Sequence, residues 1–191
     1  GREDIFFGLA TQNVEILNEV KPKRIVTTCP HCLHTIKNEY PAFGGNYEVI
    51  HHTQFINELV GSGKIQLEMT SDEWRVTFHD PCYLGRHNGI FDEPRGLIQA
   101  TGAKLTEPSR NRENSFCCGA GGGQFWKDEE KGTERVSTNR YRELKQTGAK
   151  TVATGCPFCM RMLTEETAKE EPETAMEVLD IAEIVARNLV K

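Results

Sequence analysis

Five cysteines in the second half of the chain have a spacing that could hold a metal cofactor. Cys82 is followed after 34 residues by the adjacent pair Cys117 and Cys118, and after 37 more by the Cys-x-x-Cys motif of Cys156 and Cys159. A Cys-x-x-Cys motif alone fits a zinc site, a redox dithiol or part of an iron–sulfur site. Soft thiolate ligands in this number favour zinc or iron–sulfur chemistry over hard cations.

The adjacent pair favours a cluster of several metal ions over a single ion. Zinc takes four ligands in a tetrahedron, so five thiolates would leave one over. Neighbouring residues of an extended chain point in opposite directions, so Cys117 and Cys118 suit one small ion poorly. A cluster of several irons lets two adjacent thiolates bind different irons. We therefore expect a multi-iron cluster, with a structural zinc or interaction module as an alternative.

Four glycines follow the adjacent pair, at positions 119, 121, 122 and 123. Glycine permits positive φ and close backbone approach. Backbone N–H groups of such a loop can donate to cluster sulfurs and tune the potential, whereas a flexible loop is the alternative interpretation. The segment lacks the Gly-Lys-Ser/Thr ending of a phosphate-binding loop.

A second Cys-x-x-Cys motif, formed by Cys29 and Cys32, indicates an internal repeat. A shift of 127 residues places Cys29-Pro30-His31-Cys32 on Cys156-Pro157-Phe158-Cys159, and Lys23 on Lys150. The partner cysteines of the first copy would fall before residue 1, so we expect a piece of a longer protein. The predicted domains are residues 1–70, the end of a first cysteine-rich repeat, and residues 71–191, a complete second repeat.

The hydrophobic patterns alternate between helix and strand periods. Strands are expected at residues 23–28, 47–52, 74–79, 104–107 and 150–154, and helices at 9–20, 33–40, 54–60, 89–101, 129–147 and 176–190. Residues 62–73 and 108–124 read as loops. We predict an α/β fold of two pseudo-repeated Rossmann-like halves with short, mostly parallel sheets. Cys29, Cys82 and Cys156 follow strands, and parallel strands place sites at their carboxyl ends.

Composition excludes several other classes. The 191 residues are 37% hydrophobic and 27% charged with a net charge of −5, which is typical of a soluble globular domain and not of a nucleic-acid binder. The chain has no apolar run of membrane-spanning length, and its N-terminus is unlike a signal peptide. Seven cysteines is an odd number, which favours thiolate ligands in a reducing compartment over disulfides. We expect a cytoplasmic protein, held at the cytoplasmic face of a membrane only by another domain or subunit.

Three segments, HDPCYLGRHNGIFDEPR, FCCGAGGGQFW and GCPFC, closely resemble the CCG (cysteine-rich) domain. This domain occurs in heterodisulfide reductase subunits B and D, in the iron–sulfur subunit of glycolate oxidase and in lactate-utilisation proteins. The resemblance extends from about residue 20 to 165. It implies a non-cubane [4Fe–4S] cluster whose ligands are Cys82, Cys117, Cys118, Cys156 and Cys159. Cys29 and Cys32 match only the last part of a first motif, which is incomplete here or binds zinc in the parent protein.

The resemblance implies the iron–sulfur part of a multi-domain or multi-subunit oxidoreductase. In this role the cluster relays electrons from a flavoprotein or a ferredoxin-type donor to a quinone or another acceptor. Catalytic reduction of a disulfide at the cluster is the alternative. The resemblance implies that heterodisulfide reductase uses paired clusters. This chain has a single complete five-cysteine motif, which favours the relay.

Several polar side chains near the cysteines are open to two interpretations. His79 either donates a hydrogen bond near the cluster or only ends a strand. His51 and His52 fit a helix start or packing better than a proton relay. His31 and His34 lie beside the first Cys-x-x-Cys motif and could act as substitute ligands. Arg86 and His87 either donate to a bound anion or cluster, or face solvent.

Overall fold

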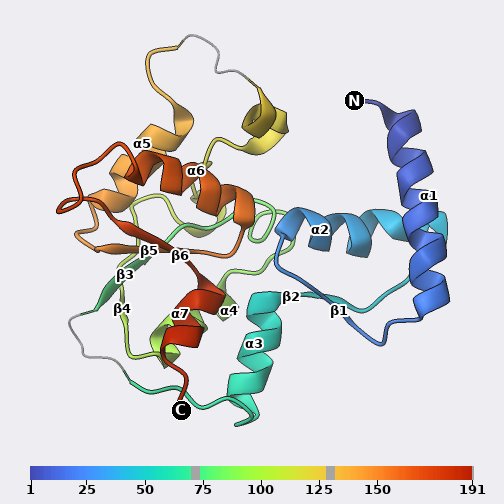
Figure 1. Cartoon of the computed structure of the whole chain (residues 1–191), viewed down its shortest axis with the longest axis horizontal. Coiled ribbons are helices and arrows are strands. Elements are labelled where there is room, and N and C mark those ends of the chain that lie inside the picture. The colour runs from blue at the N-terminus through green and yellow to red at the C-terminus, as the bar shows by residue number, and fades with distance from the viewer. Residues whose placement is uncertain (70–73, 128–131, 191) are drawn as a thin grey trace.

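The computed structural model describes residues 1–69, 74–127 and 132–190, whose strands form two parallel sheets. The larger sheet has the strand order β4-β3-β5-β6, and the smaller pairs β1 with β2. In Figure 1 helices flank the larger sheet, and the smaller sheet lies beside it. All pairs of named strands in the described residues are parallel. The predicted α/β class with short parallel sheets is confirmed.

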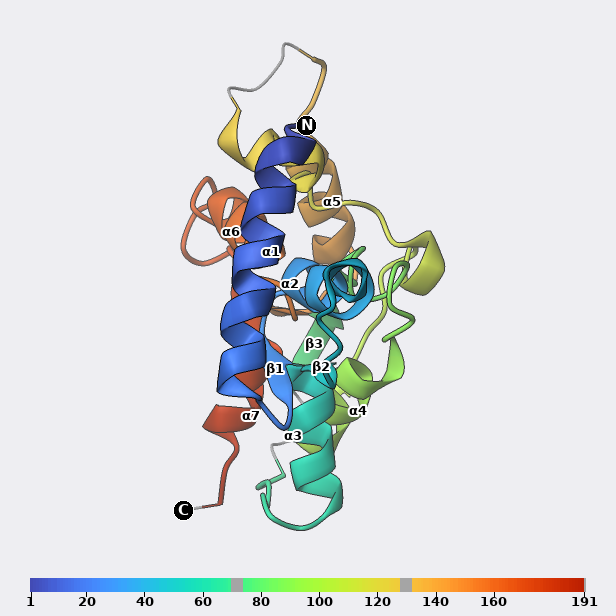
Figure 2. The same cartoon turned by 90° about the vertical axis from the view of Figure 1, so that its right-hand side faces the viewer.

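The first part of the chain forms the smaller sheet and the helices around it. In chain order these elements are α1 (Glu3–Val20), β1 (Ile25–Thr27), α2 (Pro30–His34), a π-helical turn (Thr35–Glu39), a 3-10 turn (Tyr40–Phe43), β2 (Val49–His51) and α3 (His52–Gly61). Figure 2 shows α1 as a long helix along one side of the molecule. Buried Ala10 and Val14 of α1 pack with Tyr40, which fixes this helix to the turns after α2.

The second part forms the larger sheet and its covering helices. These elements are β3 (Arg75–Phe78), α4 (Asp92–Ala100), β4 (Lys104–Leu105), 3-10 turns at Arg112–Asn114 and Gly121–Trp126, α5 (Val136–Lys145), β5 (Thr151–Thr154), α6 (Pro157–Thr167), β6 (Glu177–Asp180) and α7 (Ile181–Arg187). No described helix combines the length and the apolar character needed to cross a membrane.

The inner strand β5 of the larger sheet is buried on both faces. All four residues of the inner strand β5 are buried. Val152 packs with Leu163 on the face covered by α5 and α6, whereas Ala153 packs with Ile184 on the face covered by α4 and α7. Side chains alternate across a strand, so one short β-branched segment serves two hydrophobic layers. This burial holds the carboxyl end of β5, where Cys156 follows, in a fixed position.

Helix α3 links the two parts. It belongs to the first part in sequence, yet Ile56 and Val60 pack against the core formed by β3, α4 and α7. The helix also contacts α4 and α7 directly. The smaller sheet is thereby held beside the carboxyl ends of the larger one.

Two of the expected helices differ from the observed elements. The single helix expected at 176–190 is wrong, because β6 precedes α7 there: Val178 and Leu179 pair in register with β5, and Asp180 then begins a helix as its N-cap. The apolar residues at these positions fit both the helix period and the strand period, and pairing with β5 selects the strand. The helix expected at 129–147 begins only at Val136, and residues 129–131 of that expectation lie outside the described residues.

Two further helix boundaries shift, and one expected loop agrees with the structure. The helix expected at 33–40 starts earlier, at Pro30, because proline suits the first helical position, and the chain then continues into the π-helical turn. The helix expected at 89–101 starts at Asp92. Residues 108–124 contain two 3-10 turns within an otherwise irregular path, which agrees with the expected loop.

Candidate metal centre

Three strand ends bring cysteines to one region of the fold. Cys29 follows β1 and is the N-cap of α2, and Cys156 follows β5 and is the N-cap of α6. Cys82 comes shortly after β3, which pairs directly with β5. Both capping cysteines are followed by proline at the first helical position, which explains the repeated Cys-Pro sequence. Their sulfurs therefore lie near positive helix N-termini, which favour thiolates.

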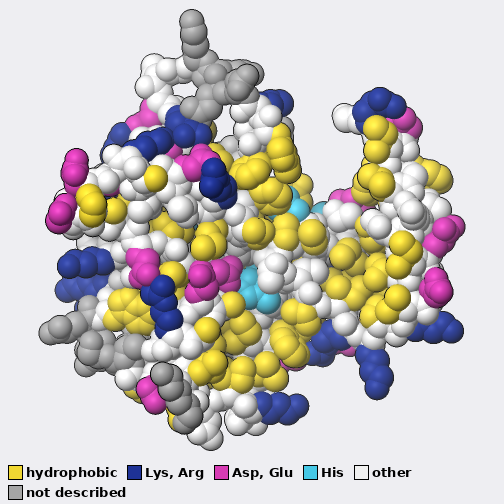
Figure 3. Space-filling view, viewed as in Figure 1, with side chains coloured by type: hydrophobic (Ala, Val, Ile, Leu, Met, Phe, Trp, Pro, Cys, Tyr) yellow, Lys and Arg dark blue, Asp and Glu magenta, His cyan; other side chains and the backbone are white. Residues whose placement is uncertain are grey.

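A cavity of about 740 Å³ lies at these strand ends, and α1 forms one of its walls. Figure 3 shows the molecule hollowed between α1 and the rest, with hydrophobic side chains on both sides. Aromatic side chains of Tyr83, Trp126 and Phe158 form part of the lining. The same lining includes six cysteines, which are Cys29, Cys32, Cys82, Cys118, Cys156 and Cys159.

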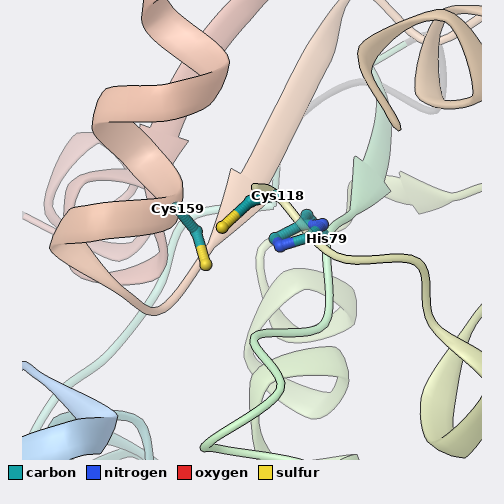
Figure 4. Close-up of side chains that lie close together, drawn as sticks. All are labelled: His79, Cys118 and Cys159. Carbon is teal, nitrogen blue, oxygen red and sulfur yellow. The ribbon is translucent and has the colours of Figure 1, made fainter. Parts of the chain in front are cut away.

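The cysteines differ in burial. Cys118, Cys156 and Cys159 are buried, with 4%, 0% and 3% of their surface exposed, whereas Cys32 is exposed. Cys29, Cys82 and Cys117 are intermediate, and all seven cysteines are free thiols. The donor atoms of Cys118, Cys159 and His79 all lie within 4.8 Å of one another, and Figure 4 shows the two sulfurs beside the histidine ring. The buried thiols thus form the inner part of the site.

Cys117 is placed differently from its neighbour. It is not part of the cavity lining, and its sulfur accepts a hydrogen bond from the Gly119 N–H at 3.2 Å. Gly119 has φ +94°, and a Cβ there would lie 3.3 Å from the Ser137 backbone nitrogen. Glycine is required at this position because an L side chain is strained in that conformation. This N–H therefore reaches a cysteine sulfur, and the expected donation from the glycine loop to cluster sulfurs stays a prediction.

Hydrogen bonds among the clustered thiols and His31 shift the pKa values of these groups. Hydrogen bonds from Cys117 and Cys159 lower the pKa of Cys118, with a further contribution from His79. The Cys159 contact also lowers the pKa of Cys156 to about 5, with a second hydrogen bond from His31, although burial opposes the shift. The pKa of His31 is in turn raised to about 9 by its hydrogen bonds to Cys156 and Cys29. Thiolates, the form that binds metals, are therefore favoured at Cys118 and Cys156.

The other polar candidates have structural partners. His51 is the N-cap of α3 and forms a capping box with Gln54, and His52 is 2.8 Å from the Asp180 carboxylate. The expected helix-start and packing roles of this pair are confirmed. Arg86 donates to the Ser115 carbonyl at 2.6 Å, so it braces the loop before the cysteine pair. His87 stacks on Tyr83 with 4.4 Å between ring centroids.

A buried ion network supports the segment that carries Cys82. Arg95 donates to both carboxylate oxygens of Asp80, at 2.7 and 2.8 Å, and to Glu107 at 2.6 Å. Asp80 also accepts from the Arg112 backbone N–H at 2.8 Å. This network was not predicted from the sequence, although the buried pair Asp80 and Arg95 flanks Cys82 within one expected strand–helix unit.

The fold and the thiol-lined cavity define an α/β protein with a soft-ligand site at the carboxyl ends of parallel strands. A model of the cysteine-rich domain family CCG matches residues 1–37 and 76–164. The chain therefore belongs to the CCG cysteine-rich domain family, as the resemblance implied. The two matched stretches include all seven cysteines.

Several curated relatives are named as oxidoreductases or their subunits. The chain is 38% identical over 191 residues to the EtfAB:quinone oxidoreductase of Syntrophomonas wolfei, a match that covers 97% of this chain and 27% of that protein. It is 39% identical to the probable iron–sulfur-binding oxidoreductase FadF of Bacillus subtilis, covering 100% and 27%. One component of the dihydromethanophenazine:CoB–CoM heterodisulfide reductase of Methanosarcina barkeri is 34% identical, covering 98% and 46%. The chain thus spans about a quarter to a half of the length of these relatives.

Proposed function

We propose that the chain is an iron–sulfur electron-transfer module of a larger oxidoreductase. In this proposal Cys82, Cys117, Cys118, Cys156 and Cys159 hold a non-cubane [4Fe–4S] cluster. The main support is one observation: Cys82, Cys118, Cys156 and Cys159, from three separate segments, line a single cavity. The family membership and the names of the relatives support the same class of cofactor.

The residues at the cavity suit such a cofactor. Four soft thiol donors face it, two of them on a helix whose N-terminus favours negative charge. The Gly119 N–H is a donor to sulfur, as expected of groups that tune a cluster. A bound cluster would supply reversible one-electron redox chemistry. The protein would hold it, limit its exposure to water and set its potential.

A single zinc ion fits this arrangement less well. Structural zinc needs four donors around one point, with zinc–sulfur distances of about 2.3 Å. In the part of the chain that the structure describes, the tightest group of candidate donors has three members, His79, Cys118 and Cys159. Cys117 is hydrogen-bonded to Cys118 and Cys156 to Cys159, so the donors form a series of contacts and do not surround one point, which suits several metal ions better than one.

We also propose a flavoprotein or a ferredoxin-type protein as the electron donor and a quinone or a disulfide as the acceptor. One relative is named an EtfAB:quinone oxidoreductase, and another a heterodisulfide reductase subunit. The non-polar cavity walls, with Ile16, Trp126 and Phe158, suit an apolar or aromatic acceptor. Attachment to a membrane would come from another domain or subunit of the parent protein.

The division at residues 1–70 and 71–191 into two pseudo-repeated Rossmann-like halves remains a proposal. It is supported by the shared local structure of the two motifs, each a strand, an N-cap cysteine and a proline-led helix. Cys29 and Cys32 would then be the end of a first motif, and zinc bound there is a separate proposal. Zinc quantitation of the wild type and of Cys29→Ser tests it, because only a real site loses zinc on substitution.

The deciding experiment is anaerobic reconstitution with iron and sulfide. We expect about four irons and four sulfides per chain, visible absorption, and an electron paramagnetic resonance signal in one redox state. Cys118→Ser should lose most of this iron, whereas the matched variant Cys32→Ser should retain it. A colourless protein with one zinc per chain would contradict the proposal. Addition of a quinone or a disulfide to the reduced protein then distinguishes relay from disulfide reduction.

A further inference from the structure

The two ring nitrogens of His79 have different surroundings. Nδ1 lies 3.0 Å from Nε of Arg140. The opposite side of the ring faces the sulfurs of Cys118 and Cys159, and the three donor atoms lie within 4.8 Å of one another. Figure 4 shows one ring nitrogen directed at these sulfurs and the other directed away. The ring is 1% exposed, so water does not compete at this position.

The Arg140 contact determines which nitrogen carries the hydrogen. A guanidinium has only donors and stays protonated in proteins. Nδ1 of His79 must therefore accept, and the neutral ring carries its hydrogen on Nε2, the nitrogen on the sulfur side. His79 thus points a donor at the sulfurs.

Arg140 is held rigidly enough to impose this arrangement. It is fully buried, and its Nη1 donates to the Arg110 carbonyl and to the Glu143 carboxylate, both at 2.9 Å. Glu143 also accepts from the Ser109 hydroxyl at 2.7 Å. The guanidinium therefore has several fixed partners besides the imidazole and little freedom to release Nδ1.

We infer that His79 is a positioning residue that donates a hydrogen bond from Nε2 to the Cys118 sulfur, and that it is not a metal ligand. This inference rests on the proposed function, in that the sulfur belongs to a cluster ligand. Donation to sulfur stabilises the more electron-rich reduced state, so the bond raises the reduction potential. No bond to His79 forms or breaks in the one-electron step.

Ligation by His79 conflicts with the same geometry. Binding a metal through Nε2 requires that nitrogen to lose its hydrogen, which would move to Nδ1. Nδ1–H would then face the Arg140 N–H at hydrogen-bond distance, donor against donor. The compact group of His79, Cys118 and Cys159 therefore consists of two thiol ligands and a hydrogen-bond donor.

The first test compares His79→Leu with His79→Gln in the reconstituted protein. Both variants should keep the iron content of the wild type. His79→Leu should lower the reduced-to-oxidised ratio about tenfold at a fixed potential. For a one-electron couple this is a shift of about 59 mV. His79→Gln, which keeps an N–H donor, should shift less. Loss of iron in both variants, or equal potentials in all three proteins, would overturn the inference.

The second test does not depend on the cluster. Nitrogen-15 NMR of histidine-labelled, metal-free chain reports the tautomer of each ring. We expect hydrogen on Nε2 of His79, and Arg140→Gln should weaken this preference while circular dichroism confirms that the fold is retained. Hydrogen on Nδ1 in the wild type would overturn the inference. A chain with this tautomer that takes up no iron would instead contradict the proposed function alone.

Discussion

The two Cys-Pro-x-Cys motifs share a sequence pattern but lie in different surroundings. Both follow a parallel strand, and in both the first cysteine caps a helix that begins with proline. The second motif follows an inner strand of the four-stranded sheet, and Cys156 and Cys159 are buried. The first follows β1 of the two-stranded sheet, and Cys32 is exposed.

The helices after the motifs also differ. α6 continues for 11 residues, whereas α2 has 5 before the π-helical turn. The third motif residue is His31 in one and Phe158 in the other, and their rings meet with centroids 5.3 Å apart. The comparison teaches that the local pattern places a sulfur at a strand end. Enclosure of that sulfur depends on the sheet and helices around it.

The largest expected effect is the loss of iron on substitution within the second motif. Cys159→Ser removes a buried thiol that contacts Cys118 and Cys156, so we expect most of the iron to be lost after reconstitution. The equivalent change in the first motif, Cys32→Ser, should leave the iron content nearly unchanged. Iron and sulfide quantitation measures both. Equal losses would show that the two motifs contribute alike.

The next effect concerns the ion pairs near each motif, which are buried near the second and exposed near the first. Arg95→Met would leave the Asp80 carboxylate, which is 3% exposed, without its main partner. Removing one member of a buried ion pair costs about 3–5 kcal/mol. Arg24→Met, beside β1, breaks exposed pairs with Glu48 and Glu58 and should change stability little. Chemical denaturation of both variants tests the difference, and similar midpoints would contradict it.

The sequence was sufficient to predict that cysteines lie at the carboxyl ends of the parallel strands. Short β-branched runs before Cys29 and Cys156 predict strands, and parallel strands place their carboxyl ends together. The class of fold and the convergence of Cys29, Cys82 and Cys156 on one cavity follow from this reasoning.

The remaining features depend on contacts between distant segments. The sequence does not show which side chains of the first part complete the cavity wall, because the position of the smaller sheet is set by packing of α3 and α1. The pairing of His79 with Arg140 spans 61 residues, and no local pattern indicates it. The strand at β6 was missed because its apolar spacing also fits a helix.

A smaller effect tests the glycine loop of the second motif. Gly119→Ala places a side chain at φ +94°, with its Cβ 3.3 Å from the Ser137 nitrogen. We expect a cost of about 1–2 kcal/mol from the left-handed conformation. Gly121→Ala meets no atom within 4 Å and should be nearly neutral. Thermal unfolding compares the two, and equal midpoints would show that backbone conformation at Gly119 is unimportant.

The smallest effect concerns the caps of the outer strands. β2 and β6 each end in a capping box, formed by His51 in the smaller sheet and Asp180 in the larger. Asp180→Ala should cost at least about 1 kcal/mol, because the Ala182 N–H loses its acceptor and His52 loses its carboxylate partner. Asp180→Asn keeps an acceptor and should cost less. The free energy of unfolding of both variants provides the test, and an equal cost would rule out capping as the cause.

The most direct measurement is anomalous X-ray scattering at the iron edge from crystals of the anaerobically reconstituted chain. We predict several neighbouring iron peaks in the cavity, within bonding distance of sulfurs from Cys82, Cys117, Cys118, Cys156 and Cys159. A single metal peak, a zinc edge in place of an iron edge, or iron bound away from these cysteines would contradict the five-cysteine site.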